Sequence, residues 1–181
     1  MKKFELTNEF IANRFGTKLF RIRALVEFGD VEAGELGGYV EKESNLGHDD
    51  NAWVYGNARV YGNAQVSGNA RVYGNARVCG NALVCGNAWV YGNAWVYGDA
   101  QVSGDARVCG DARVCGNGDY AYAHGFGSVN RTTTFFRLKD GGVGVRCGCF
   151  YGTLAQFRDK IRETHGETKL SLIHISEPTR L

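Results

Sequence analysis

Between residues 51 and 116 the hydrophobic and polar positions repeat every six residues without interruption. The first unit reads Asn-Ala-Trp-Val-Tyr-Gly, and the last, Asp111 to Gly116, reads Asp-Ala-Arg-Val-Cys-Gly. A fixed short period indicates a stacked, repetitive architecture, and a six-residue period is typical of a β-helix. This stretch predicts the element around which the rest of the chain is organised.

The alternation inside each unit predicts which side chains form the core. Side chains alternate across a strand, so the alanine and the valine, two residues apart, face one way and the residues around the valine face the other. Alanine and valine never vary, as at Ala52 and Val54, whereas the flanking positions hold many residue types. A narrow core allows no extra methylene, which accounts for this invariance. Glycine with asparagine or aspartate suits the corners, and three strands with three corners make a coil of 18 residues.

Stacking at 18 residues sorts the outward side chains into columns on three faces. The first face carries the predicted surface ladder of Trp53, Arg71, Trp89 and Arg107, with Tyr55, Tyr73, Tyr91 and Cys109 beside it. Alternating arginine and tryptophan suit cation–π stacking. The ladder is either self-stabilising or a platform for a planar or anionic ligand.

The other two faces differ in character. The second face carries Arg59, Arg77, Trp95 and Arg113, with Tyr61, Cys79, Tyr97 and Cys115 beside them. The third face is small, uncharged and flat, with Gln65, Leu83 and Gln101 flanked by Ser67, Cys85 and Ser103. Since closed symmetry is the common arrangement of homo-oligomers, we interpret the third face as an oligomer interface.

The flanking segments predict caps, which the exposed strand edges of a β-helix end require. Residues 1–50 predict an N-terminal β cap with a hairpin turning at Asn13–Gly16. The β-helix is assigned to residues 51–123, because 119–123 read as one more strand. Residues 124–169 predict a C-terminal α+β module: a hairpin around Lys139–Gly142 and a helix with Thr153 as N-cap.

Residues 170–181 resemble a translated sequencing-library adaptor, so we exclude them from the fold and expect the natural module to continue beyond Lys169.

The loop from His124 to Thr132 is the candidate ligand site in the C-terminal module. Its glycines, Gly125 and Gly127, let backbone N–H groups approach a ligand, and Arg131 with Ser128 and Asn130 suits a phosphate or carboxylate. A plain connecting turn is the alternative interpretation.

Composition narrows the function classes. The chain has 21 Lys+Arg against 19 Asp+Glu, so the charge balance favours neither nucleic acid nor an anionic membrane as a partner. No apolar run is long enough to span a bilayer, and the first residues do not form a signal-peptide core. The six cysteines read as reduced thiols, those after the core valines lying at the surface, and we expect a cytoplasmic location. Cys147 and Cys149 lack a second cysteine pair, so we predict no metal and no cofactor.

The hexads resemble the hexapeptide-repeat superfamily, which implies a left-handed parallel β-helix of triangular section and often a trimer. The likeness extends to the opening Phe-Glu-Leu-Thr-Asn-Glu, to Leu-Gly-Gly-Tyr-Val-Glu-Lys-Glu before the array, and to Asn-Arg-Thr-Thr-Thr-Phe-Phe and Cys-Gly-Cys-Phe-Tyr-Gly-Thr-Leu after it. With these motifs the chain is similar to phage and prophage proteins labelled polymer-forming or transferase-like. Such labels rest on the repeat, and a fold does not imply a function.

The sequence predicts an all-β solenoid that acts as a non-enzymatic scaffold or binding protein for a protein partner or small anionic ligand. An acyltransferase is one alternative, but its usual histidine base is missing, because the eleven hexads contain no histidine. Sequestration of a nucleotide-like signalling molecule is the other alternative.

Overall fold

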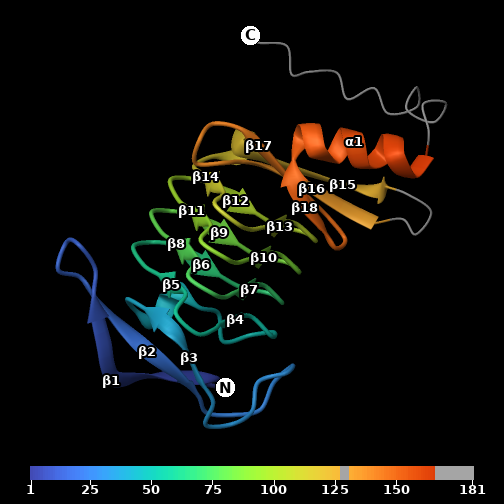
Figure 1. Ribbon diagram of the computed structural model, residues 1–181. Coiled ribbons are helices and arrows are strands. Elements are labelled where there is room, and N and C mark those ends of the chain that lie inside the picture. Colours follow the sequence, from blue (N-terminus) through green and yellow to red (C-terminus); the bar gives the residue numbers. More distant parts are fainter. Residues whose placement is uncertain (127–130, 166–181) are drawn as a thin grey trace.

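The computed structural model describes residues 1–126 and 131–165. The chain forms a parallel β-solenoid between an N-terminal β cap and a C-terminal antiparallel sheet that carries one helix (Figure 1). The predicted all-β solenoid with its two caps is thereby confirmed. The elements are β1 (Phe4–Ala12), β2 (Lys18–Ala24), β3 (Leu36–Val40), η1 (Glu43–Asn45), β4 (Trp53–Val54), β5 (Arg59–Val60), β6 (Gln65–Val66), β7 (Arg71–Val72), β8 (Arg77–Val78), β9 (Leu83–Val84), β10 (Trp89–Val90), β11 (Trp95–Val96), β12 (Gln101–Val102), β13 (Arg107–Val108), β14 (Arg113–Val114), η2 (Asn117–Asp119), β15 (Tyr120–Phe126), β16 (Arg131–Arg137), β17 (Val143–Cys147), β18 (Phe150–Thr153) and α1 (Leu154–His165).

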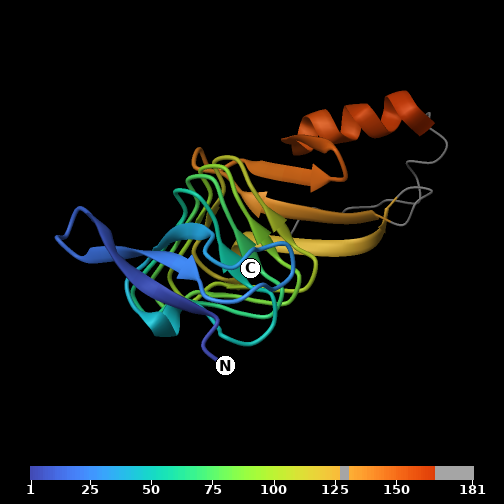
Figure 2. The ribbon, with the colours of Figure 1, turned by 90° about the horizontal axis from the view of Figure 1, so that it is seen from below.

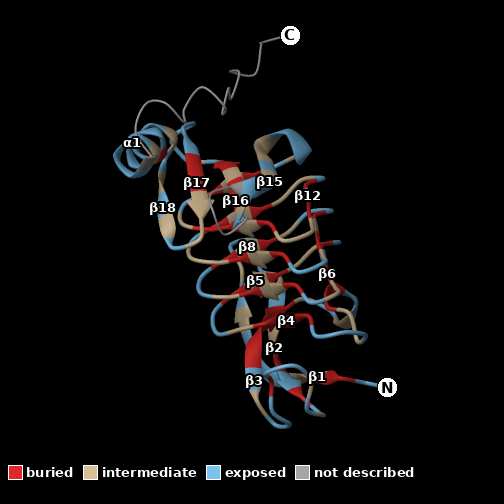
Figure 3. Ribbon diagram, turned by 90° about the vertical axis from the view of Figure 1, so that its right-hand side faces the viewer, coloured by how far each residue is buried: buried red, intermediate tan, exposed pale blue. Residues whose placement is uncertain are grey.

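The solenoid has the predicted register. Each coil contributes one short strand to each of three parallel sheets, and neighbours in a sheet lie 18 residues apart, as Trp89 with Arg71 and Leu83 with Gln65. Every hexad alanine and valine is at most 1% exposed, so these two residue types form the core along the repeat, joined only by Trp53 in the first coil and Cys109 in the last. The buried stripe runs through all coils in Figure 3. The invariance of the inward positions follows from this narrow cross-section.

The corners explain why glycine and asparagine recur. At Gly86, with φ +66°, a Cβ would lie 2.9 Å from the backbone nitrogen of Gly104 in the next coil. The asparagines form ladders in which the side-chain N–H of Asn69 donates to Asn87 Oδ1 (3.1 Å) and that of Asn87 to Asp105 Oδ1 (3.0 Å). The last coil ends these ladders with aspartate, which only needs to accept.

The N-terminal cap satisfies the carbonyl end of the solenoid. Backbone N–H groups of each coil donate to carbonyls of the next coil, so the first coil presents carbonyls that lack such donors. Strand β3 supplies the N–H of Tyr39 to the Ala58 carbonyl (2.9 Å). The Asn45 side chain donates to the Ala64 carbonyl (2.8 Å), and the Lys3 ammonium to the Ala52 carbonyl (3.0 Å).

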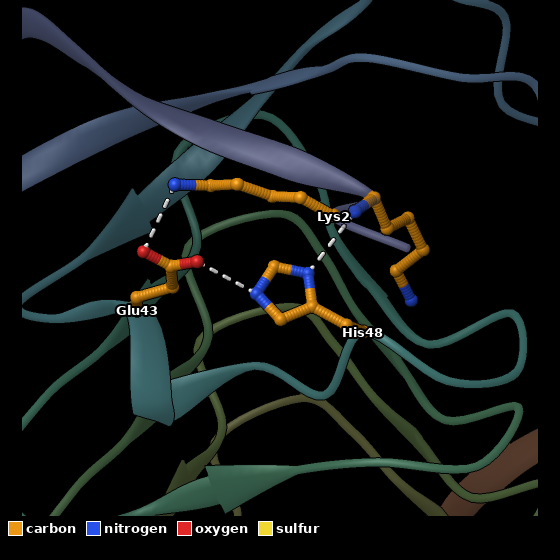
Figure 4. Close-up of polar contacts among 4 residues, drawn as sticks. Lys2, Glu43 and His48 are labelled. Carbon is orange, nitrogen blue, oxygen red and sulfur yellow. Dashed lines mark hydrogen bonds and ion pairs between the residues drawn. The ribbon is translucent and has the colours of Figure 1, made fainter.

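His48 connects the first residues of the chain to the rest of the N-terminal cap (Figure 4). Its Nδ1 accepts the backbone N–H of Lys3 (3.1 Å), so this tautomer carries its proton on Nε2, which lies 2.8 Å from Glu43 Oε1. Lys2 Nζ donates to the other carboxylate oxygen of Glu43 (3.1 Å). The ring also stacks on Phe4, with centroids 4.5 Å apart. Both ring nitrogens of His48 therefore serve the structure of the cap.

The C-terminal cap satisfies the opposite, N–H end of the solenoid with acceptors. Asn117 Oδ1 accepts the N–H of Gln101 (2.8 Å), and Asp119 Oδ2 accepts that of Cys115 (2.9 Å). Tyr120 belongs to the same cap: its strand β15, whose residues up to 123 we assigned to the β-helix, pairs antiparallel with β16 instead. Strands β15 to β18 form one antiparallel sheet across the end of the prism.

Helix α1 packs on the face of this sheet that is turned away from the solenoid (Figure 1). Phe157, 6% exposed, contacts Phe135 and Phe150 of the sheet with ring centroids 6.3 and 5.3 Å apart. The predicted N-cap is confirmed, because Thr153 Oγ1 accepts the N–H of Gln156 (3.3 Å). Gln156 Oε1 in turn accepts the N–H of Thr153 (2.9 Å), a reciprocal capping box.

Candidate functional site

The first face carries the predicted column of arginine and aromatic side chains. Trp89 lies between Arg71 and Arg107. The guanidinium carbons of these arginines are 5.5 and 4.7 Å from the centroid of the Trp89 ring. Tyr73 and Tyr91, in the neighbouring column, stack with centroids 4.9 Å apart and ring planes 2° from parallel. All five side chains are partly exposed. The face therefore places partly exposed aromatic side chains beside positive charge.

Trp53 does not belong to this surface, which corrects the predicted ladder. The side chain is fully buried because the N-terminal cap covers the first coil. Phe4 and Phe28 contact it edge-on, with ring centroids 6.2 and 5.4 Å away. The exposed ladder thus begins at Arg71, and Trp53 joins the cap to the solenoid core.

The C-terminal sheet projects beyond the outline of the solenoid, on the side of the first face (Figures 1 and 2). Thr134 Oγ1 on β16 accepts the backbone N–H of Arg107 on β13 (2.9 Å). The hydroxyl oxygens of Tyr122 and Tyr151 lie over Gly104 and Gly110, where an added Cβ would come within 2.1 and 2.0 Å of them. The sheet therefore crosses the last strand of the first face, and the two surfaces meet in a corner.

Arg146 is the cationic side chain that the sheet adds to this corner. It pairs with Thr134 across β16 and β17, so both side chains lie on the face of the sheet that meets the solenoid. Its Nη1 donates to the Cys149 carbonyl (3.5 Å), while its Nε is buried without a hydrogen-bond partner. We define the corner site as Arg107, Trp89, Tyr73, Tyr91 and Arg146.

Electrostatics link the two sides of the corner site. Burial raises the pKa of Tyr73, and the charges of Arg107, Arg146 and Arg71 oppose that rise, so these guanidinium groups act on one hydroxyl. Arg71 is neutralised by an ion pair with Asp30 (2.8 Å). Within residues 1–126 and 131–165, neither Arg107 nor Arg146 forms an ion pair. The corner therefore holds two positive charges that no carboxylate of the described chain neutralises.

The predicted loop site is brought together only in part. His124 Nδ1 lies 2.9 Å from Thr132 Oγ1, and its Nε2 lies 3.9 Å from Asp105 Oδ2 at the solenoid corner. Arg131 lies against the β17–β18 turn, where a Cβ on Gly148 would come within 2.3 Å of Arg131 Nη1. Gly125 lies in β15 with φ +93°. Gly127, Ser128 and Asn130 lie outside the described residues.

A shallow pocket at the edge of the same sheet was not predicted from the sequence. It has a volume of about 340 Å³ and is lined by Asp111, Leu138, Lys139, Asp140 and Tyr151. A solenoid corner, the β16–β17 turn and β18 contribute these residues. Because they lie up to 40 positions apart in the sequence, no local motif could have indicated the pocket.

The predicted exposure of one cysteine is wrong. Cys109, predicted to be a surface thiol, is 2% exposed because the C-terminal sheet covers β13, and burial raises the pKa of its thiol. Cys79 and Cys85 are partly exposed and Cys115 is exposed, all with free thiols.

Among the residues described, no three His, Cys, Asp or Glu side chains gather closely enough to hold a metal ion. The same part of the chain contains no helix that is long and apolar enough to cross a membrane.

Comparison with known proteins supports a β-solenoid repeat protein. A family model described as the YdcK β-solenoid repeat matches the chain in six overlapping segments, residues 52–68, 64–80, 76–92, 82–98, 90–104 and 100–116. The matched residues coincide with the hexads and include Trp89 and Arg107 of the corner site, but neither cap. No curated protein matches the chain.

Proposed function

We propose that this β-solenoid repeat protein is a non-enzymatic scaffold that binds a small anionic ligand in its corner site. The observation that carries the proposal is the placement of Arg107 and Arg146, two cations without an acidic partner in the described chain, beside stacked Tyr73 and Tyr91. Charge-assisted hydrogen bonds from arginine are strong and geometrically selective. The rigid solenoid fixes one arginine and the sheet fixes the other.

The aromatic side chains favour a planar ligand, which makes a nucleotide-like signalling molecule the second candidate. Bases stack on exposed aromatic rings in a sequence-tolerant way, and arginine adds cation–π attraction. The partly exposed tyrosine pair offers such a ring, whereas the guanidinium groups of Arg71 and Arg107 already cover Trp89. Arg107 and Arg146 suit phosphate oxygens. The phage origin implied by the resemblance is part of the same proposal.

The acyltransferase alternative has no general base at His48. A general base needs a free ring nitrogen within reach of the proton it removes, and both nitrogens of His48 are engaged within the cap. His124 keeps Nε2, which lies 3.9 Å from Asp105 Oδ2, while its Nδ1 lies 2.9 Å from Thr132 Oγ1. We rank the scaffold function above acyl transfer because the hexads themselves contain no histidine.

Arg107→Ala and Arg146→Ala are expected to weaken ligand binding by about 10- to 100-fold, the loss of one charge-assisted hydrogen bond. A thermal-shift screen against nucleotides and acyl-CoA identifies the probe, and titration calorimetry with that probe measures the affinity. Arg71→Ala is the matched control, because Arg71 stacks on the same Trp89 but pairs with Asp30.

Unchanged affinity in both corner variants would refute the corner site. Loss of affinity in Arg131→Ala alone would instead move the site to the predicted loop. Loss in Arg71→Ala alone would place the ligand lower on the first face, away from the sheet.

We further propose that the third face, Gln65, Leu83 and Gln101, mediates homo-oligomerisation, with a trimer implied by the resemblance. Leu83→Lys, which puts a charge in the contact, should shift the mass measured by light scattering towards the monomer. Leu36→Lys is the control, since Leu36 is also an exposed leucine (48%) but lies in the N-terminal cap. An unchanged mass, or a monomeric wild type, would contradict this proposal.

A further inference from the structure

On the second face of the solenoid, the alternation of arginine and tryptophan side chains is interrupted at one place. Trp95 separates Arg77 from Arg113, whose guanidinium carbons lie 4.7 and 4.6 Å from its ring centroid. On the first face Trp89 separates Arg71 from Arg107 in the same way. Arg59 and Arg77, however, are direct neighbours in register on β5 and β8.

This pairing is electrostatically unfavourable in the free protein. Neighbouring strands lie about 4.8 Å apart, and like charges directly opposite each other destabilise a sheet. Within the described chain, the Arg59 guanidinium has no ion pair, hydrogen bond or ring contact. The Arg77 guanidinium has a cation–π contact with Trp95. A local arrangement that costs stability without a compensating contact is characteristic of a functional position.

Tyr61 and Glu41 complete the surroundings of the two arginines. Tyr61 follows Arg59 by two residues and therefore faces outward beside it, and its hydroxyl shares a hydrogen bond with the Cys79 thiol. Burial raises the pKa of Tyr61 to about 12, and the charges of Arg77 and Arg59 act in the opposite direction. Glu41 follows by two residues the Tyr39 that pairs with Arg59, and its carboxylate accepts the backbone N–H of Gly62 (2.6 Å).

We infer that Arg59 and Arg77 form a second anion site, which binds a phosphate group between their guanidinium groups. A phosphate dianion neutralises both charges at once, whereas a carboxylate neutralises only one of them. Arginine also matches phosphate oxygens with two parallel N–H donors. This site lies on a different face from the corner site and does not depend on it.

Calorimetric titration of the full chain with inorganic phosphate tests the inference. Arg59→Gln and Arg77→Gln should each weaken phosphate binding by about tenfold or more, the loss of one charge-assisted contact. Arg113→Gln is the matched control: it lies on the same sheet and against the same Trp95, but its guanidinium already donates to the Ala112 carbonyl (2.8 Å). Affinity for phosphate should therefore stay at the wild-type value in this control.

Two further measurements distinguish a site from general salt effects. Binding of phenyl phosphate should weaken as the pH falls below about 6, where the ester dianion gains a proton, while sulfate binding should not change. In chloride buffer without phosphate, Arg59→Gln should melt at a higher temperature than the wild type, because the repulsion is relieved. Phenyl phosphate compared with inorganic phosphate separates the sources: tighter binding of the ester indicates a small-molecule phosphate ester, and equal binding indicates free phosphate.

Equal phosphate affinity in the wild type and both glutamine variants would overturn the inference, as would an equal loss in Arg113→Gln. A lower melting temperature of Arg59→Gln in chloride would show that the arginine pair is not strained. Because the corner-site variants leave Arg59 and Arg77 intact, failure of the proposed function would not affect this result.

Discussion

Replacement of Val84 by phenylalanine is expected to destabilise the protein by at least the roughly 1–3 kcal/mol that is typical of overpacking. Val84 lies in a central coil, is fully buried, and belongs to one core cluster with the other hexad alanines and valines. The backbone cannot widen one coil without breaking its hydrogen bonds to both neighbours, such as that from the Ser67 N–H to the Val84 carbonyl (3.0 Å). Denaturant titration measures the loss.

Leu36→Phe is the control for this prediction. Leu36 lies in strand β3 of the N-terminal cap, outside the third face, and is 48% exposed. A phenylalanine there should change the free energy of unfolding by no more than about 0.5 kcal/mol, as surface substitutions usually do. If both variants unfolded at the same denaturant concentration, the inward assignment of the valines would be untenable.

The stability of the wild type relative to Lys3→Met is expected to rise with pH above about 8. Lys3 is 3% exposed, and burial lowers its pKa from 10.5 to about 8, against the opposing charges of Asp50 and Asp49. Between these two pKa values the unfolded chain holds a proton that the folded chain has lost, so the free energy of unfolding increases with pH. The slope reaches up to about 1.4 kcal/mol per pH unit. Below pH 8 both states are protonated and the difference should be flat.

Chemical denaturation of both proteins from pH 7 to 9.5 measures this difference. Taking wild type minus variant cancels the cysteine and tyrosine contributions that the two share. Lys2→Met is the control, because Lys2 is half exposed and its Nζ pairs with Glu43 (3.1 Å) at the surface. Parallel pH profiles of wild type and Lys3→Met would mean that the buried amine keeps its proton throughout the range.

The sequence alone was sufficient for every feature that depends on neighbours along the chain or on the 18-residue period. The buried alanines and valines, the pairing of Trp89 with Arg71 and Arg107, and the uncharged third face follow from counting along the repeat. The turns at Gly16 and Gly141 and the capped start of α1 at Thr153 follow from local turn and cap chemistry. These interactions connect residues whose separation is fixed by the strand or helix itself.

The tertiary structure decided what the two caps do to the ends of the solenoid. Trp53 and Trp89 occupy equivalent positions in the repeat. Phe4 and Phe28 bury Trp53, however, whereas Trp89 stays partly exposed. In the same way the C-terminal sheet covers Cys109 and brings Arg146 to the first face. The six-residue period determines only the position of a residue within a coil. Burial and charge in the first and last coils depend on how the two non-repeating caps pack against the strand edges of those coils.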